Sequence, residues 1–264
     1  VRSPLSSEVS TFIDQDYPLL RDTNGFSGSK KFSIDVSDDE KPHLIFLFLE
    51  SYRAKDVGVL GGNFPASPEF DRLSKDGILF SNFYATGVQT TRAVVSSLYG
   101  IMPRFSKAAV QSDQPNIKLQ GLPEIMHDRG YTNAFFHNGS LAFEKKQAFF
   151  SNHQYDKIFG EKDIALATPN AKQSSSWGLH DEYLMDFTLD WLEKHDPKGP
   201  AFVTMFTVSN HHPWHIPTWH TPPSFDVDEP TEYANYLRSF SYSDHALGQF
   251  IDGLRASGLA KKSI

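Results

Sequence analysis

The sequence contains no cysteine. Its absence excludes a disulfide scaffold, a zinc–thiolate site and a cysteine nucleophile. The sequence also lacks a run of about 18 apolar residues, which is the length that a membrane-spanning helix requires. Positive charge is scarce, because 25 lysine and arginine residues are outnumbered by 32 aspartate and glutamate residues. The resulting net charge of -7 argues against a nucleic-acid-binding protein, whose surface is normally basic.

The chain divides into a polar lead-in and a more apolar domain. Residues 1–42 are rich in serine, aspartate, glycine and lysine and have no sustained hydrophobic period, so we expect a linker there. The first residue is Val1 rather than methionine, and we expect a soluble part of a longer protein whose membrane anchor precedes it. Residues 43–264 are sufficient for one α/β domain with a full core.

Short apolar runs alternate with amphipathic stretches along the domain. The runs predict strands at 43–49, 78–84, 132–136 and 201–208. The amphipathic stretches predict helices within 64–76 and at 91–99, 122–129, 141–150, 181–195 and 232–257. Strands separated by helices predict a doubly wound, mostly parallel sheet sandwiched by helices. The first run is apolar throughout, which indicates a central strand covered on both faces.

Polar residues follow each of the four predicted strands. Glu50 follows the first strand, the loop 86–92 the second, His137 and Asn138 the third, and residues 209–212 the fourth. Ligands of doubly wound sheets bind at the carboxyl ends of the strands. We therefore expect these residues to form one site.

Several of these residues suit metal-assisted phosphoryl transfer, and each also has an ordinary structural interpretation. Glu50 either caps the turn after its strand or supplies a carboxylate to a hard cation. Thr90 and Thr91 precede a predicted helix, where one of them either caps the helix or serves as a metal-activated nucleophile. Arg92 either forms a surface ion pair or neutralises a tetrahedral anion.

Histidines end the third and fourth predicted strands. His137 and His211 either donate hydrogen bonds to phosphoryl or hydroxyl oxygens or are structural histidines. A zinc site is a further alternative for the cluster of His211, His212, His215 and His220. The spacing of this cluster matches no zinc signature, and the intervening prolines and tryptophans favour a stacked loop.

Six segments, taken in order, resemble one protein family. They are LFLES, SPEFDRLSKDGILFSNFYATG, TTRAVVSSLYG, FFHNG, SNHHPW and YSDHALGQFIDGLRASGL. The set resembles the sulfatase-type branch of the alkaline phosphatase superfamily, and within it the lipoteichoic acid synthases and related membrane-anchored phosphoglycerol transferases. The resemblance extends from about residue 43 to the last residue and implies the alkaline phosphatase/sulfatase-like fold.

The resemblance implies a role for each matching residue. Glu50 matches a ligand of Mn²⁺ or Mg²⁺. Thr90 matches the nucleophile, which also contacts the metal, and Thr91 is the alternative nucleophile because the alignment shifts by one residue when counted from the preceding loop. His137 and His211 match histidines that contact the substrate.

The sequence departs from the family pattern at the headgroup site. A tryptophan and an arginine of the family correspond to Glu144 and Lys146 here. Lysine keeps the positive charge without the bidentate fork, and the loss of tryptophan removes a stacking face. We expect Lys146 and Arg92 to contact the substrate, while the headgroup preference stays open.

The second departure concerns the metal. The family completes its metal site with an Asp-His pair at the end of a strand, whereas Asp244 and His245 lie within a predicted helix, where adjacent side chains diverge by about 100°. We interpret Asp244 as a structural polar residue of that helix. The chain ends where the strand carrying the pair is expected to begin, so we expect a truncated domain with an incomplete metal site.

These observations favour a metal-dependent phosphotransferase at the extracytoplasmic face of the bacterial membrane. We expect it to move a phosphoglycerol-type or phosphoethanolamine-type headgroup from a phospholipid to a glycan or polymer hydroxyl through a threonine-linked intermediate. One alternative is a sulfatase-like phosphodiesterase or hydrolase, although residues 88–92 lack the C/S-x-P-x-R pattern that sulfate ester chemistry requires. The other is an inactive fragment that lacks the Asp-His ligands.

Overall fold

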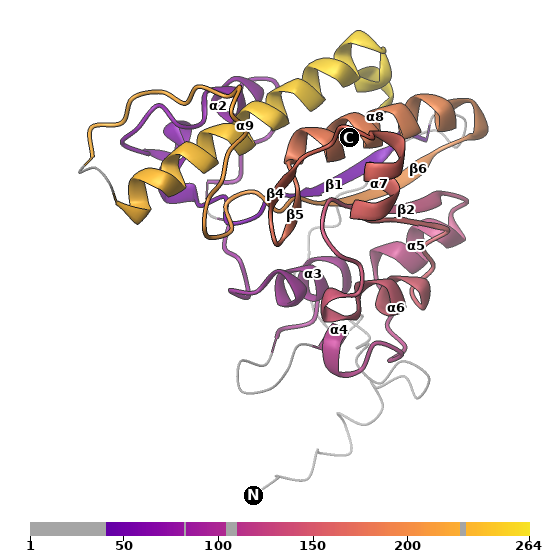
Figure 1. The fold of residues 1–264 in the computed structure, drawn as a ribbon. Helices are drawn as coiled ribbons and strands as arrows, with labels where there is room; N and C mark the ends of the chain where they lie inside the picture. Colours follow the sequence, from indigo (N-terminus) through magenta and orange to yellow (C-terminus); the bar gives the residue numbers. More distant parts are fainter. Residues whose placement is uncertain (1–40, 82, 104–109, 228–230) are drawn as a thin grey trace, which may run out of the picture.

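The computed structural model describes residues 41–81, 83–103, 110–227 and 231–264 (Figure 1). Residues 1–40, which make up nearly all of the predicted lead-in, lie outside the described residues. Within the described ranges, no helix combines the length and the apolar character that a membrane crossing requires.

A four-stranded parallel sheet forms the centre of the domain. Its strands are β1 (Leu44–Phe48), β2 (Thr132–His137), β3 (Lys157–Phe159) and β6 (Ala201–Phe206), and their spatial order is β1-β6-β2-β3. All three pairings are parallel, which confirms the predicted α/β architecture. The strands β4 (Gln173–Ser175) and β5 (Gly178–Leu179) form a separate antiparallel hairpin.

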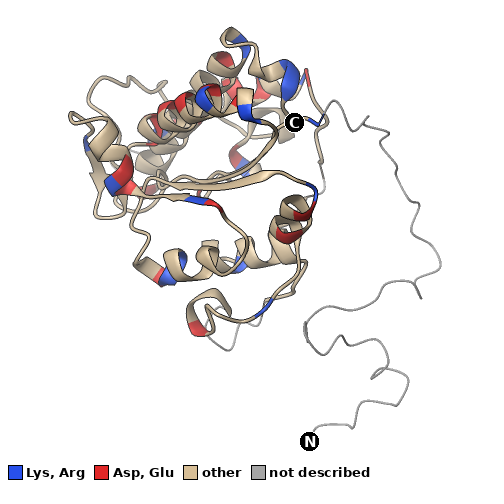
Figure 2. Ribbon diagram, turned by 90° about the vertical axis from the view of Figure 1, so that its right-hand side faces the viewer, with Lys and Arg blue, Asp and Glu red and all other residues tan. Residues whose placement is uncertain are grey.

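Helices cover both faces of the sheet. On one face lie α8 (Asp181–His195) and α9 (Glu232–Ala256), and on the other lie α3 (Thr90–Tyr99), α4 (Val110–Asp113), α5 (Leu122–Asp128) and α6 (Lys146–Ser151) (Figure 1). The remaining helices are α2 (Pro68–Leu73), which packs on α9, and α7 (Glu161–Ala167). Short 3-10 turns span Ala54–Asp56, Gly58–Leu60, Phe143–Lys145, Asp196–Lys198 and Leu259–Lys262. In the view of Figure 2, acidic and basic residues are interspersed along the helices.

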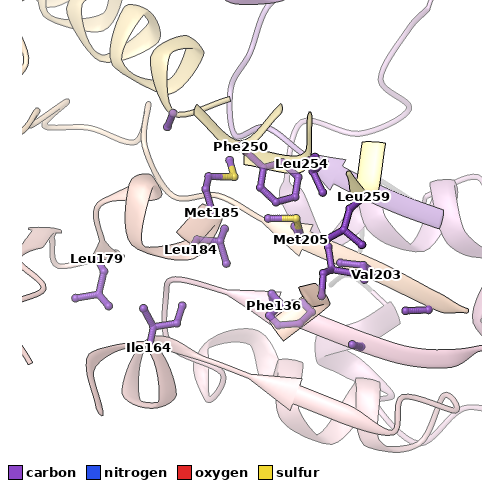
Figure 3. Close-up of a cluster of buried hydrophobic side chains, with 14 residues drawn as sticks. Phe136, Ile164, Leu179, Leu184, Met185, Val203, Met205, Phe250, Leu254 and Leu259 are labelled. Atoms are coloured by element: carbon purple, nitrogen blue, oxygen red, sulfur yellow. The ribbon is translucent and has the colours of Figure 1, made fainter. Parts of the chain in front are cut away.

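The sheet separates two hydrophobic cores, one on each face, and the strands contribute side chains to both. Figure 3 shows the cluster beneath α8 and α9, where Phe136 and Met205 of the sheet meet Phe250 of α9. On the opposite face, Phe135 is fully buried and stacks on Phe150 with ring centroids 4.0 Å apart. Because alternate residues of a strand point to opposite faces, strands between two helical layers are largely apolar on both faces.

The first strand is an edge strand, not the central strand that its composition predicts. Leu44 and Phe48 pack into one core and Ile45 and Leu47 into the other, which accounts for the uninterrupted apolar run. On the outer side of β1, the last residues of the sequence are its sole pairing partners among the described residues: the Ile45 N–H donates to the carbonyl oxygen of Ile264 at 2.8 Å. This position leaves Phe46 39% exposed.

The strand predicted at 78–84 is wrong. Residues 78–81 and 83–84 form no strand in the described structure. Four apolar side chains of this segment are largely exposed, namely Ile78, Phe80, Phe83 and Tyr84. A strand is defined by its hydrogen-bonded neighbour, and no described segment pairs with this one. The apolar and aromatic residues of this segment therefore favour a strand, but no described strand lies beside it to form the hydrogen bonds.

Asp244 of α9 is a structural residue, as its place in the predicted helix indicates. It is buried, and its carboxylate accepts hydrogen bonds from the N–H groups of Glu69 at 2.8 Å and Phe70 at 2.9 Å and from the Tyr52 hydroxyl at 2.7 Å. Burial raises the pKa of Asp244, against the effect of these hydrogen bonds. The side chain thereby caps the first turn of α2 from another helix.

Replacement of Asp244 by alanine is expected to lower the free energy of unfolding by about 2 kcal/mol, because three donors lose their acceptor. Urea unfolding measures this change. Asp252→Ala on the same helix is a matched control, since the 60% exposed Asp252 side chain only forms surface ion pairs with Arg72 and Arg255. An equal effect of the two substitutions would contradict the assigned role of Asp244.

Candidate functional site

The carboxyl ends of β1, β2 and β6 bring predicted site residues together at one edge of the sheet. Glu50 lies two residues beyond β1, and His137 is the last residue of β2. His211 follows β6 after a short turn. Loops at the carboxyl ends of parallel strands share one edge of a sheet, so residues far apart in the sequence become neighbours there.

Thr90 and Glu50 are in direct contact. The Thr90 hydroxyl donates to Oε2 of Glu50 at 2.7 Å. Thr90 is the first residue of α3, and Gln89 at the N-cap position makes no side-chain capping bond. The hydroxyl of Thr90 thus contacts the strand-end carboxylate and projects from a helix N-terminus, where backbone N–H groups favour an anion.

The backbone around Glu50 is held by residues that follow β6. The Glu50 N–H donates to the Thr207 hydroxyl at 2.9 Å, and the Glu50 carbonyl oxygen accepts from the Asn210 side-chain amide at 3.0 Å. Ser51 and Asn210 both have left-handed backbone conformations, with φ of 47° and 73°. Two uncommon backbone conformations at one point indicate a tightly determined local geometry.

His211 lies between the carboxylate and an aromatic wall. Its Nε2 is 3.6 Å from Oε1 of Glu50. Its ring stacks on the Trp177 indole, with centroids 4.1 Å apart and planes inclined by 12°. The Trp177 Nε1–H donates to the carbonyl oxygen of His212 at 3.1 Å, which fixes the indole against the same loop.

His137 is a buried and neutral imidazole. Its Nδ1 lies 3.0 Å from the carbonyl oxygen of Phe206, which can only accept, so the ring proton resides on Nδ1 and Nε2 is an acceptor. Burial lowers the pKa of His137 to about 3, with smaller contributions from Lys146 and His211. At neutral pH His137 therefore accepts a hydrogen bond from a ligand, whereas the sequence indicated a donor.

Lys146 places a positive charge in the same region. The side chain is buried, and its Nζ donates to the carbonyl oxygen of Phe143 at 3.2 Å and lies 4.7 Å from the centre of the Phe143 ring. Burial lowers the pKa of Lys146, while Glu144 and Glu50 oppose the shift. The predicted helix at 141–150 is broken before Lys146, because Glu144 and Lys145 have φ of 53° and 55°.

Thr91 and Arg92 take no part in the contact between Thr90 and Glu50. Thr91 is buried, and its hydroxyl has no hydrogen-bond partner among the described residues. Arg92 follows Thr90 by two residues, which is about 200° around a helix. Its Cβ approaches Gly87 so closely that a Cβ built on that glycine would lie 2.7 Å away. The helix therefore directs the three side chains to different surroundings.

Two residues of the site were not predicted from the sequence. Trp177 lies in the turn of the β4–β5 hairpin. The strands of this hairpin are too short to show a hydrophobic periodicity in the sequence. Asp181 begins α8 and is fully buried; its Oδ1 accepts from the Asn138 amide at 2.8 Å and from the N–H groups of Val208 and Ser209, both at 3.1 Å. Asp181 thus joins the residue that follows His137 to the segment that leads to His211.

Two glycines hold the hairpin against the end of β2. Gly139 and Gly178 form an isolated antiparallel bridge. A Cβ built on Gly139 would lie 2.6 Å from the carbonyl oxygen of Trp177 and 2.7 Å from Nε2 of His137. Gly178 has φ of 152°, and a Cβ there would lie 2.1 Å from the carbonyl oxygen of Asn138. No side chain larger than hydrogen fits between these two backbones as they stand.

Replacement of Trp177 by alanine is expected to loosen the loop 211–214, because a stacking contact and a hydrogen bond, each worth about 1 kcal/mol, are lost. Amide hydrogen exchange at Trp214, whose N–H donates to His211, should accelerate roughly tenfold or more. Trp177→Phe keeps a ring to stack and should produce a smaller acceleration. Unchanged exchange in the alanine variant would show that the stack does not order this loop.

Glu50 and Thr90 fit a hard divalent cation in chemistry and position. A carboxylate oxygen and a hydroxyl oxygen 2.7 Å apart are of the type that Mn²⁺ and Mg²⁺ prefer, and they would supply two of about six ligands. No group of three or more histidine, aspartate or glutamate side chains in the described parts of the chain is arranged to hold a metal.

The alternative zinc cluster is not formed. His211 stacks on Trp177, and His215 Nδ1 lies 3.2 Å from the carbonyl oxygen of Ser174. His220 packs against the ring of Tyr242. The histidines of this loop serve different contacts, as the intervening prolines and tryptophans indicate.

Comparison with known proteins agrees with this architecture. Residues 42–264 match the Sulfatase family model. The chain is 25% identical over 229 residues to lipoteichoic acid synthase 2 of Bacillus subtilis (strain 168), which covers 85% of this chain and 34% of that protein. It is 26% identical over 237 residues to phosphoglycerol transferase I of Escherichia coli (strain SMS-3-5 / SECEC), covering 86% of this chain and 30% of that protein. The chain therefore spans about a third of the length of these curated relatives.

A solved structure shares the fold. It is a protein of the alkaline phosphatase superfamily from Vibrio parahaemolyticus, with a TM-score of 0.74 and 28% sequence identity; the match covers 85% of this chain and 53% of that chain. The family match includes every element of the sheet and every residue of the candidate site. The chain belongs to the sulfatase family, within the alkaline phosphatase superfamily.

Proposed function

We propose that residues 43–264 carry the nucleophile of a phosphotransferase that moves a phosphoglycerol-type headgroup from a phospholipid to a glycan or polymer hydroxyl. The observation that carries this proposal is the hydrogen bond of 2.7 Å from the Thr90 hydroxyl to Glu50. The name of the relative phosphoglycerol transferase I supports transfer of phosphoglycerol. A phosphoethanolamine-type headgroup is the alternative. A reaction between these substrates would take place at the extracytoplasmic face of the bacterial membrane.

In the first step Thr90 Oγ1 attacks the phosphorus of the phospholipid headgroup. The bond from Oγ1 to phosphorus forms, the bond from phosphorus to the diacylglycerol oxygen breaks, and the proton lost by Thr90 ends on that oxygen. Glu50 accepts the hydrogen bond of the hydroxyl and thereby orients the attacking oxygen. A divalent cation, Mn²⁺ or Mg²⁺, held by Glu50 and Thr90 would lower the pKa of the hydroxyl.

The surrounding residues bind the headgroup. Lys146 supplies positive charge toward the phosphoryl oxygens, and Arg92 is a further candidate on the same helix as Thr90. His137 presents Nε2 as an acceptor for a glycerol hydroxyl, and His211 faces Glu50 with its Nε2. In the second step an acceptor hydroxyl attacks the same phosphorus, and Thr90 regains its proton.

The experiment uses the full chain with Mn²⁺ and phosphatidylglycerol labelled in its acyl chains. The expected result is release of labelled diacylglycerol together with a Thr90 peptide that carries the added mass of phosphoglycerol. Release that accelerates with a glycan acceptor supports a transferase, whereas release at the same rate in water alone indicates a hydrolase. Absence of the modified peptide under conditions of steady release would reject the threonine-linked intermediate.

A further inference from the structure

The long helix α9 supports the turn that follows Glu50. The carbonyl oxygen of Ser51 accepts a hydrogen bond from the Tyr236 hydroxyl at 2.8 Å. The ring of Tyr52 stacks on Phe240, with ring centroids 4.2 Å apart. Both partners belong to α9, so consecutive residues of the turn rest on one helix that lies far away in the sequence.

The two left-handed residues beside Glu50 are both hydrogen-bonded to the same turn of α9. Ser51, with φ of 47°, is held through its carbonyl oxygen by Tyr236. Asn210, with φ of 73°, donates its N–H to the Ser239 hydroxyl at 3.0 Å. Tyr236 and Ser239 are three residues apart and are therefore neighbours on one face of the helix. Because left-handed conformations of residues other than glycine persist where the surroundings enforce them, this turn of α9 stabilises both.

The same two residues connect directly to Glu50. The side-chain amide of Asn210 donates to the carbonyl oxygen of Glu50 at 3.0 Å. The hydroxyl of Ser51 donates to Oε1 of Glu50 at 3.1 Å, while Oε2 accepts from Thr90. The direction of the carboxylate therefore depends on the conformations of Ser51 and Asn210.

Tyr236 and Ser239 are suited to a fixed supporting role. Both side chains are buried. Burial raises the pKa of the Tyr236 hydroxyl, against the effect of the neighbouring Arg53, so the hydroxyl remains a donor at neutral pH. The Arg53 guanidinium lies 4.4 Å from the centre of the Tyr236 ring and 2.6 Å from the buried carboxylate of Asp56. The ring is thus covered by a side chain that is itself held in place.

We propose that Tyr236 and Ser239 are positioning residues that direct the Glu50 carboxylate toward Thr90. Loss of either hydroxyl would release a left-handed residue beside Glu50, and the carboxylate would turn away from the nucleophile. The consequence for catalysis rests on the proposed function, in which Thr90 attacks phosphorus. The consequence for the geometry of Glu50 rests on the hydrogen bonds alone.

The first test compares variants that each remove a single hydroxyl from α9. Tyr236→Phe and Ser239→Ala are expected to lower kcat for diacylglycerol release roughly tenfold or more, because a small misplacement of a catalytic group is costly. The KM for phosphatidylglycerol should stay within about twofold, since the residues proposed to bind the headgroup are unaltered.

Tyr233→Phe is the matched control. It removes a hydrogen bond of 2.7 Å from the same helix, but its acceptor is Asp56 and not the turn beside Glu50. This variant should keep the kcat of the wild type. An equal loss of kcat in Tyr233→Phe, or an unchanged kcat in both Tyr236→Phe and Ser239→Ala, would overturn the proposal. The two test substitutions lie at different positions, so one that prevents folding leaves the other as the test.

A second measurement requires no activity and follows the full chain by NMR. The Thr90 methyl signal and the Glu50 carboxyl carbon signal are expected to shift in Tyr236→Phe and in Ser239→Ala, and to stay in place in Tyr233→Phe. Shifts of this kind in a protein that releases no diacylglycerol would reject the proposed function and retain the positioning role. Unshifted Thr90 and Glu50 signals in both test variants would reject the positioning role, whatever the activity of the wild type.

Discussion

Diacylglycerol release by the Thr90→Ala variant is expected to fall roughly 10³-fold or more, because the oxygen that forms the bond to phosphorus is removed. The fold should be unaffected, since Thr90 is partly exposed and contributes one side-chain hydrogen bond, to Glu50. The measurement is initial-rate release from labelled phosphatidylglycerol with Mn²⁺. Mass spectrometry of the same samples should find no phosphoglycerol on the variant.

Thr91→Val is the matched control for this experiment. Valine has nearly the shape of threonine, and the Thr91 hydroxyl is buried without a hydrogen-bond partner in the described structure, so its loss should leave activity within about twofold and not reduce stability. If Thr91→Val abolishes release and Thr90→Ala does not, the nucleophile is Thr91 and the contact with Glu50 has another purpose. Release that persists in both variants would reject the threonine mechanism.

Asp181→Ala is expected to lower the free energy of unfolding by about 4 kcal/mol, the largest stability effect that we predict, because three buried donors lose one acceptor oxygen. These donors belong to Asn138, Val208 and Ser209, on the loops after β2 and β6. Denaturant unfolding measures the loss. Activity should fall with it, since the first loop follows His137 directly and the second carries His211.

Asp181→Asn provides the control for Asp181→Ala. The amide keeps Oδ1, which accepts all three hydrogen bonds, and its nitrogen replaces Oδ2, which lies 3.4 Å from the Ser243 hydroxyl. The cost should therefore be about 1 kcal/mol. Burial already raises the pKa of the Asp181 carboxyl, which means that its surroundings disfavour the charged form. Replacing the carboxylate by a neutral amide should therefore cost less here than in an exposed ion pair. If both substitutions were equally destabilising, the negative charge and not the acceptor oxygen would be essential.

Local sequence patterns predicted the elements whose stability depends on burial alone. The helix predicted at 181–195 matches α8 at both ends, because its apolar stripe packs on the sheet beneath it. The strand predicted at 132–136 matches β2 except for one added residue, His137. The strand ends then located Glu50, His137 and His211 as neighbours, which is a property of parallel sheets in general.

The wrong and missing predictions concern elements whose formation or position depends on contacts with other segments of the chain. Residues 78–84 are mostly apolar and aromatic, as a strand would be, yet strand formation depends on a neighbouring edge. The three-residue strand β3 (Lys157–Phe159) is too short to show the hydrophobic periodicity by which a strand is predicted. Trp177 reaches the site through a hairpin whose position is set by contacts with β2, and nothing in the hairpin sequence predicts that contact.

The bridge between Gly139 and Gly178 sets the distance between the β4–β5 hairpin and the end of β2 at the site. With hydrogen in both positions, the hairpin backbone rests directly on the end of β2, and Trp177 is brought within stacking distance of His211. A methyl group at either position would act as a spacer, because it would meet backbone oxygen atoms at 2.6 Å or less. The hairpin would have to lift, and the site would widen without any change in the residues that face it.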